Sequence, residues 1–202
     1  MELILIRHLK TPGNEKRQYI GSTDEDLSEQ EVLNFKKKCK QASYPQVQQV
    51  IVSPMKRCIQ TAELIYPKNQ ITQEVLLKEC DFGIFEGLTY KELKGKYPQE
   101  LEQWNKEFST YRIPEGESFL DVRRRVEAFL KDIPSGEENK SEKMLITAHK
   151  GTLGHLLAAM LKLPTEGYWN FVFDQGCYSE VDLEDGYAII RKLNVRDIPR
   201  DI

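Results

Sequence analysis

Hydrophobic residues along this chain gather in short runs that alternate with helical patterns and polar loops. Runs rich in Leu, Ile and Val predict buried strands at about 2–7, 48–53 and 143–148. Helical patterns follow them from Ser28 to about Ala42 and at about 55–66 and 152–163. This alternation predicts a three-layer α/β/α fold with a central, mainly parallel sheet.

Weaker signals complete the outline. Ser118 and Asp121 form a capping-box pattern that opens a helix to about Ile133, and 71–72 is a short strand candidate. Residues 177–183 and 187–193 flank a turn and predict a C-terminal β-hairpin. We expect one domain over 1–202, with a polar helical lid at about 88–112, a linker loop at 134–142 and a loose tail from Arg196.

Composition excludes several classes of protein. Charged residues make up 30% of the 202 residues and the net charge is −3. The sequence lacks the excess of basic residues that is typical of nucleic-acid-binding proteins, so we expect no nucleic-acid partner. No apolar run approaches the ~20 residues that cross a bilayer, and we expect no membrane partner and no signal peptide. The four cysteines Cys39, Cys58, Cys80 and Cys177 show no C-x-x-C pairing. We therefore expect free thiols in a reducing cytoplasm, and the sequence allows a homodimer.

Candidate chemistry lies where the apolar runs end. Arg7 and His8 follow the first run, His149 follows the third, and Arg57 lies on the helix after the second. Ligands of open α/β sheets bind outside the carboxyl ends of the strands, so these four side chains are expected to converge. Two imidazoles beside two guanidiniums suit a phosphate ester, because an imidazole can attack phosphorus while guanidiniums neutralise the phosphoryl oxygens.

Such a reaction needs a group that protonates the leaving oxygen. Glu79 is the best candidate, since it follows an apolar stretch and precedes a turn glycine, and Asp81 and Glu86 are its rivals. His8, His149 and Glu79 could also ligate a metal, but two nearby arginines would repel a cation. We therefore expect neither a metal nor a cofactor.

Several blocks of sequence resemble the histidine phosphatase superfamily, also called phosphoglycerate mutase-like. They are Arg7-His8, 53–62 (SPMKRCIQTA), 79–87 (ECDFGIFEG), 114–118 (PEGES) and 148–151 (AHKG), in the order of that family. The resemblance implies that His8 is the phosphorylated nucleophile and Glu79 the proton donor. It also implies that Arg7, Arg57 and His149 form the phosphate pocket, which Asn14 and the backbone of Ile20 and Gly21 complete.

Two positions depart from the family pattern. Leu9 stands where the family usually has Gly after the nucleophile, and Gly tolerates backbone conformations that Leu avoids. Ala148 and Lys150 flank the second histidine, where Ser or Thr and Gly are usual. Lys150 would add positive charge beside the phosphate.

The resemblance implies a phosphoric monoester hydrolase that acts on a small phosphate monoester without a metal. The stretch 13–28 is similar to the α-ribazole phosphatases, which favours α-ribazole 5′-phosphate as substrate. Three alternatives stay open: a broad-specificity or sugar-phosphate phosphatase, a phosphoglycerate mutase, and a non-catalytic phosphoryl-binding regulatory protein. The region after Glu86 lacks paired arginines, which disfavours the mutase.

Other features have plainer interpretations. Arg123, Arg124 and Arg125 are consecutive on a helix and are interpreted as a solvated stripe. His155 is expected to have a packing or surface role. Among the aromatic residues of the expected lid, Trp104 or Tyr111 could cover a flat aromatic substrate.

Overall fold

A six-stranded sheet organises the part of the chain that the computed structural model describes, which is residues 1–39, 44–133, 142–184 and 186–196. The strand order across the sheet is β3-β2-β4-β1-β5-β6. The strands are β1 (Glu2–Arg7), β2 (Gln49–Val52), β3 (Ile71–Gln73), β4 (Lys143–Ala148), β5 (Tyr178–Glu184) and β6 (Tyr187–Val195).

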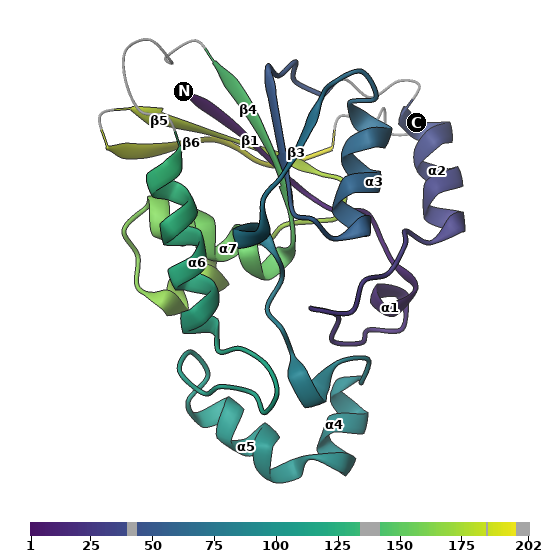
Figure 1. The fold of residues 1–202 in the computed structure, drawn as a ribbon, viewed down its shortest axis with the longest axis vertical. Helices are drawn as coiled ribbons and strands as arrows, with labels where there is room; N and C mark the ends of the chain where they lie inside the picture. Colours follow the sequence, from purple (N-terminus) through teal and green to yellow (C-terminus); the bar gives the residue numbers. More distant parts are fainter. Residues whose placement is uncertain (40–43, 134–141, 185, 197–202) are drawn as a thin grey trace.

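The first four strands are parallel, and the last two form an antiparallel hairpin beside β1. The predicted mainly parallel sheet and C-terminal hairpin are thus confirmed. Helices α2 (Glu29–Cys39) and α3 (Lys56–Ile65) lie on one side of the sheet, and α6 (Phe119–Asp132) and α7 (Lys150–Met160) lie on the other (Figure 1).

Alternation along β1 explains the layers. Leu3 and Leu5 pack into the core beneath α6 and α7, whereas Ile4 and Ile6 pack into the core beneath α3, and all four are fully buried. Side chains of a strand point alternately to its two faces, so a strand covered on both sides must be apolar throughout. This is why the run is continuous in the sequence.

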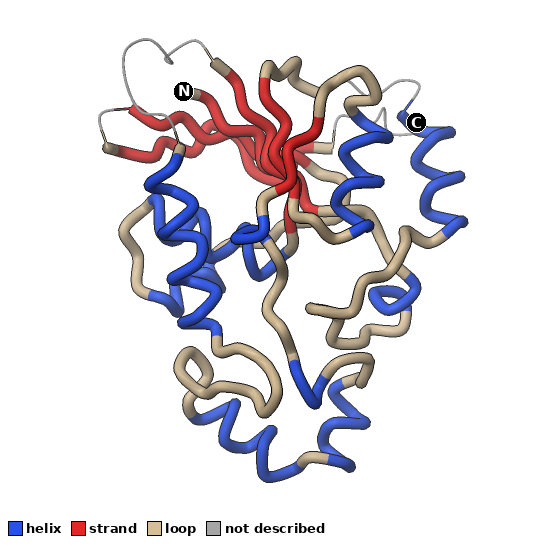
Figure 2. Tube along the Cα trace, viewed as in Figure 1, coloured by secondary structure: helices blue, strands red, loops and turns tan. Residues whose placement is uncertain are grey.

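A second lobe lies beyond the carboxyl ends of the parallel strands (Figure 2). It contains α4 (Tyr90–Lys96) and α5 (Pro98–Lys106), and Thr89 caps α4 through a capping box with Glu92. Its core is aromatic and includes Phe85, Trp104 and Phe119. Short helical turns lie between the longer elements: α1 (Pro12–Glu15), η1 (Val75–Leu77), η2 (Gly83–Phe85) and η4 (Thr165–Asn170).

Some boundaries differ from the expected ones. The helix expected at 152–163 begins at Lys150 and ends at Met160, because His149 is its N-cap and Lys162 has a left-handed φ of 58°. Three parts of the expected elements lie outside the described residues: 40–42 of the helix expected from Ser28, 134–141 of the expected linker and 197–202 of the expected tail. Across the described chain, no helix is long and apolar enough to cross a membrane.

Candidate active site

The two histidines meet at the carboxyl ends of neighbouring strands. His8 follows β1, His149 follows β4, and these strands pair directly. The ring centroids of His8 and His149 are 5.1 Å apart, so the predicted convergence of these two residues is observed.

His8 is buried and its ring is oriented by the backbone. Its Nδ1 lies 2.6 Å from the carbonyl oxygen of Leu9. A carbonyl only accepts hydrogen bonds, so Nδ1 carries the proton and Nε2 keeps a lone pair. Burial, assisted by the charges of Arg57 and Arg7, holds the pKa of His8 well below its ordinary value. The imidazole is therefore neutral at pH 7, which is the form that can act as a nucleophile.

Leu9 fits at the position where the family usually has Gly. Its N–H donates to Thr61 Oγ1 at 3.0 Å, and its side chain packs with Leu27 and Phe35. A Cβ on Gly176 would lie 2.6 Å from Leu9 Cδ2, so Gly176 makes room for the larger residue. Leu9 is not among the described non-glycine residues with positive φ, so its backbone needs none of the freedom of glycine.

Arg57 and His149 form a layer behind His8. Both are fully buried, and Arg57 Nε donates to His149 Nδ1 at 3.2 Å. His149 Nε2 therefore carries the proton and donates to Ser53 Oγ at 2.8 Å. Burial, with the charge of Arg57 next, keeps the pKa of His149 well below its ordinary value.

The remaining donors of Arg57 hold a loop. Nη1 and Nη2 donate to the carbonyl oxygens of Thr23 and Gly21, each at 2.8 Å. Neither Arg57 nor His149 lines the cavity beside His8. The backbone of Gly21 is occupied too, because its N–H donates to Glu86. A Cβ on Gly21 would lie 1.7 Å from the carbonyl oxygen of Cys80, which explains the glycine.

A cavity of about 330 Å³ opens beside His8. The sequence-predicted residues that line it are Arg7, His8, Asn14, Ile20, Glu79 and Lys150. Arg7 Nη1 donates to the carbonyl oxygen of Phe173 at 2.9 Å, while its buried Nε has no hydrogen-bond partner among the described residues. A buried unpaired donor beside His8 is suited to an anion. Within the described chain, no cluster of three or more His, Cys, Asp or Glu side chains is arranged for a metal ion.

The structure distinguishes Glu79 from its two rivals. Glu79 lines the cavity, and its carboxylate accepts hydrogen bonds from the N–H groups of Gly151 at 3.1 Å and Cys80 at 3.0 Å. The carboxylate of Glu86 is surrounded by backbone N–H groups of residues 21–23 and 82. Asp81 Oδ1 accepts from Ser22 Oγ and from the N–H of Gly83, both at 2.9 Å. Only Glu79 of the three faces the cavity.

Eight of the residues that line the cavity are aromatic. They are Tyr19, Phe82, Trp104, Phe108, Phe119, Tyr168, Trp169 and Phe171, which we call the aromatic wall. Of the two residues suggested by the sequence to cover a substrate, Trp104 lines the cavity and Tyr111 does not. Tyr168, Trp169 and Phe171 lie in or directly after η4, a segment for which the sequence suggested no element. The adjacent aromatic residues Tyr168 and Trp169 are the feature of the sequence that could have indicated this part of the wall.

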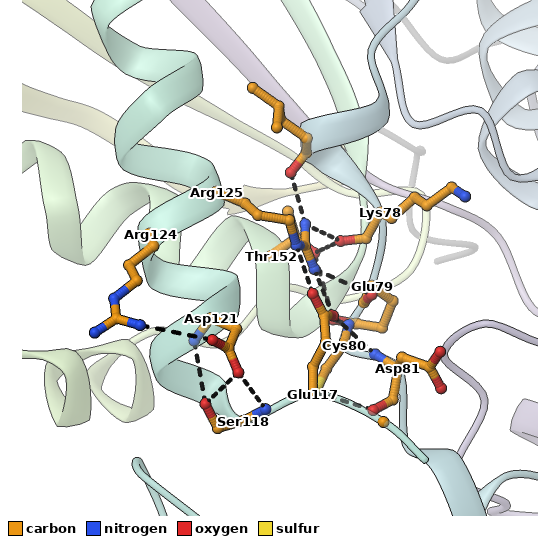
Figure 3. Close-up of polar contacts among 12 residues, drawn as sticks. Lys78, Glu79, Cys80, Asp81, Glu117, Ser118, Asp121, Arg124, Arg125 and Thr152 are labelled. Atoms are coloured by element: carbon orange, nitrogen blue, oxygen red, sulfur yellow. Dashed lines mark hydrogen bonds and ion pairs between the residues drawn. The ribbon is translucent and has the colours of Figure 1, made fainter. Parts of the chain in front are cut away.

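The interpretation of residues 123–125 as a solvated stripe is wrong for two of the three. Arg124 is exposed, but Arg123 is buried and pairs with Glu127 at 2.6 Å. Arg125 turns away from solvent and bonds to Glu117 and to the segment that carries Glu79 (Figure 3). Consecutive helical residues point in different directions, so one of them can reach an interior loop while its neighbour faces water.

Comparisons with known proteins agree with this geometry. The model of the histidine phosphatase superfamily (branch 1) matches residues 3–196. The chain is 29% identical over 197 residues to phosphoserine phosphatase 1 of Hydrogenobacter thermophilus, covering 96% of this chain and 92% of the relative. It is 28% identical to the adenosylcobalamin/alpha-ribazole phosphatase of Salmonella typhimurium, covering 99% of both chains.

A solved structure shares the whole fold. The alpha-ribazole phosphatase from Shigella flexneri superposes with a TM-score of 0.86 at 28% identity and covers 100% of both chains. The chain belongs to the histidine phosphatase superfamily.

Proposed function

We propose that this protein hydrolyses a small phosphate monoester through a phosphohistidine at His8. The neutral ring with its lone pair on Nε2 supports this role. In the first step Nε2 bonds to phosphorus, the P–O ester bond breaks, and Glu79 gives its proton to the leaving oxygen. In the second step Glu79 takes a proton from water, which attacks phosphorus and releases phosphate from His8.

Fixed positive charge supplies the stabilisation that phosphoryl transfer needs, so the mechanism requires no metal ion. Arg7 and Lys150 line the cavity and would contact the phosphoryl oxygens directly. Asn14 uses Oδ1 for its bonds to Thr11 and Gln175, which leaves its NH₂ group as a donor. Arg57 would reach the phosphate by exchanging its bonds to the loop carbonyls for the ligand, and His149 would follow as its hydrogen-bond partner.

The aromatic wall is the observation that favours α-ribazole 5′-phosphate as the substrate. The organic part of this nucleotide ends in a flat apolar benzimidazole base, whereas phosphoserine ends in an ammonium and a carboxylate. Flat bases pack well on aromatic side chains. The similar proteins include both a phosphoserine phosphatase and an adenosylcobalamin/alpha-ribazole phosphatase. A wall of eight aromatic residues suits α-ribazole 5′-phosphate rather than phosphoserine.

The test is phosphate release from α-ribazole 5′-phosphate, phosphoserine, 3-phosphoglycerate and p-nitrophenyl phosphate, with His8→Ala as the control. A kcat/KM for α-ribazole 5′-phosphate about 10²-fold above the others, or about 2.7 kcal/mol, is expected. An equal rate on all substrates that His8→Ala abolishes would identify a broad-specificity phosphatase. Isomerisation of 3-phosphoglycerate would identify a mutase. No release from any substrate would leave a phosphoryl-binding protein.

Trp169 offers a direct test of the aromatic wall. It is 57% exposed, so Trp169→Ala should leave the fold intact while removing part of the wall. We expect KM for α-ribazole 5′-phosphate to rise about tenfold and KM for phosphoserine to stay unchanged. Tyr187→Ala is the matched control, because Tyr187 is an exposed aromatic residue on β6 outside the wall. Equal effects of the two variants would count against the nucleotide.

We also propose the cytoplasm as the location. Cys58, Cys80 and Cys177 are free thiols, and free thiols are typical of a reducing compartment. Sedimentation analysis of the purified protein would decide between a monomer and the homodimer that the sequence allows.

A further inference from the structure

All the N–H groups of the Arg125 guanidinium donate to residues 76–79 or to the carboxylate of Glu117. Its Nη1 donates to the carbonyl oxygens of Leu76 and Lys78 at 2.7 and 3.1 Å, and its Nη2 donates to that of Glu79 at 3.3 Å. Its Nε and Nη2 also donate to the two carboxylate oxygens of Glu117, each at 2.9 Å. A guanidinium carries five N–H donors, so none is left for a substrate.

Glu117 holds the same segment from its other side. Besides pairing with Arg125, its Oε2 accepts from the N–H of Asp81 at 3.1 Å, and its own N–H donates to the carbonyl oxygen of Asp81 at 2.8 Å. Arg125 therefore binds the backbone carbonyls before and at Glu79. Glu117 binds the backbone at Asp81, two residues after Glu79. Figure 3 shows the pair between α6 and this segment.

Glu79 is also held from α7, where the N–H of Gly151 and the hydroxyl of Thr152 donate to its carboxylate at 3.1 and 3.3 Å. Residues 78–82 belong to no helix or strand, so they lack the regular hydrogen bonds of secondary structure. From the α7 side, Thr152 Oγ1 donates to the carbonyl oxygen of Lys78 at 2.8 Å. Arg125 thus ties the backbone of this segment to α6, and Glu117, which precedes α6, holds it at Asp81.

We propose that Arg125, clamped by Glu117, is the positioning residue for the general acid Glu79. The inference rests on the proposed function, in which Glu79 protonates the leaving oxygen. Arg125 does not line the cavity, so it acts only by fixing where the carboxyl group of Glu79 stands. A displacement of about 1 Å in a reacting group can lower a rate about 10²-fold, so a loosened segment should weaken proton transfer while leaving nucleophilic attack in place.

Esters with different leaving groups distinguish a defect in proton transfer from a defect in nucleophilic attack. An alkoxide must receive a proton as the P–O bond breaks, whereas 2,4-dinitrophenolate leaves without one. The experiment compares kcat/KM for the enzyme's preferred alkyl phosphate with kcat/KM for 2,4-dinitrophenyl phosphate. The variant is Arg125→Met, which keeps a long apolar side chain, and Arg124→Met is the matched control on the same helix. Arg124 is exposed, and its Nη1 lies 3.8 Å from Oδ1 of Asp121, a loose ion pair.

We expect Arg125→Met to lower kcat/KM for the alkyl phosphate about 10²-fold and that for the dinitrophenyl ester about threefold or less. Arg124→Met should change both by less than about twofold. Glu79→Gln should show the same selective loss, and Arg125→Met added to Glu79→Gln should cause no further loss, because two residues that act through one proton are not additive.

Three results would overturn the proposal. They are an equal loss on both esters, no loss on either, and a full additional loss in the double variant. If Arg125→Met does not fold in thermal unfolding, Glu117→Gln provides the test, since it keeps the shape of the side chain. Glu117→Gln should lower kcat/KM for the alkyl phosphate about tenfold more than kcat/KM for the dinitrophenyl ester. An equal loss on both esters would refute the role of Glu117 in holding Arg125. If Glu79→Gln loses activity mainly on the alkyl phosphate but Arg125→Met does not, the positioning role of Arg125 is refuted and the proposed function stands. Full activity of His8→Ala would refute the proposed function itself.

Discussion

Stability at acid pH should depend on a buried histidine that takes no part in the proposed chemistry. His155 on α7 is fully buried and its ring stacks on that of Tyr168 with 4.3 Å between the centroids. Within the described chain, neither of its ring nitrogens has a hydrogen-bond partner. The sequence-based expectation of a packing role is confirmed. Burial, followed by the charges of Arg123 and Arg125, lowers the pKa of His155 to about 3, against the opposing charge of Glu166.

The effect on stability follows from proton binding. Between the ordinary pKa of 6.5 and about 3, the unfolded chain binds a proton at His155 and the folded chain does not. Acid therefore favours the unfolded state, and the contribution to stability that is present above pH 6.5 is lost as pH falls. At a slope of about 1.4 kcal/mol per pH unit, lowering the pH to about 5 removes about 2 kcal/mol.

His155→Leu tests this magnitude. Urea unfolding of both proteins, followed by tryptophan fluorescence at about pH 8 and about pH 5, gives four free energies of unfolding. The wild type should lose about 2 kcal/mol more than the variant between the two pH values. His8 and His149 titrate in both proteins, so their contributions cancel. An equal loss in the two proteins would refute the assignment of His155 as a buried neutral group.

Three further predictions concern other parts of the structure. Leu9→Ala should cost about 2–5 kcal/mol in urea unfolding because the side chain is buried, yet kcat/KM should stay within about threefold, and a large rate loss at unchanged stability would contradict this. Glu86→Gln should cost about 1–3 kcal/mol, because an NH₂ group would face the N–H donors of residues 21–23, and a variant as stable as wild type would show that these contacts are weak. Burial raises the pKa of the Cys58 and Cys80 thiols, so iodoacetamide should label them only after unfolding, and mass spectrometry showing prompt labelling of the native protein would overturn that expectation.

The strands and one helix start could be predicted because local sequence specifies them. The runs at 2–7 and 143–148 coincide with β1 and β4, since a strand buried on both faces must be apolar throughout. Ser118 caps α6 through its capping box with Asp121, as their spacing indicated. The meeting of His8 and His149 followed from the rule that parallel strands present their carboxyl ends at one edge.

Features made by distant segments could not be predicted in the same way. The bonds of Arg125 reach residues 76–79, and helical periodicity describes only neighbours on one helix. Tyr168 and Trp169 join the aromatic wall through a connection with no periodic pattern. The burial of Arg57 and His149 behind His8 depends on loop carbonyls at Gly21 and Thr23, whose positions no pattern encodes.

The place of β1 in the sheet has a consequence for how the protein is made. β1 is translated before the other five strands of the sheet, yet its two neighbours, β4 and β5, begin at Lys143 and Tyr178. Joining segments so far apart in the chain carries a large loop-closure entropy and slows folding. His8 therefore leaves the ribosome long before the residues that surround it. A nascent chain that stops before β4 has the nucleophile but lacks Lys150 and Gly151 of the cavity, so activity arises only after β4 and the residues that follow it have been made.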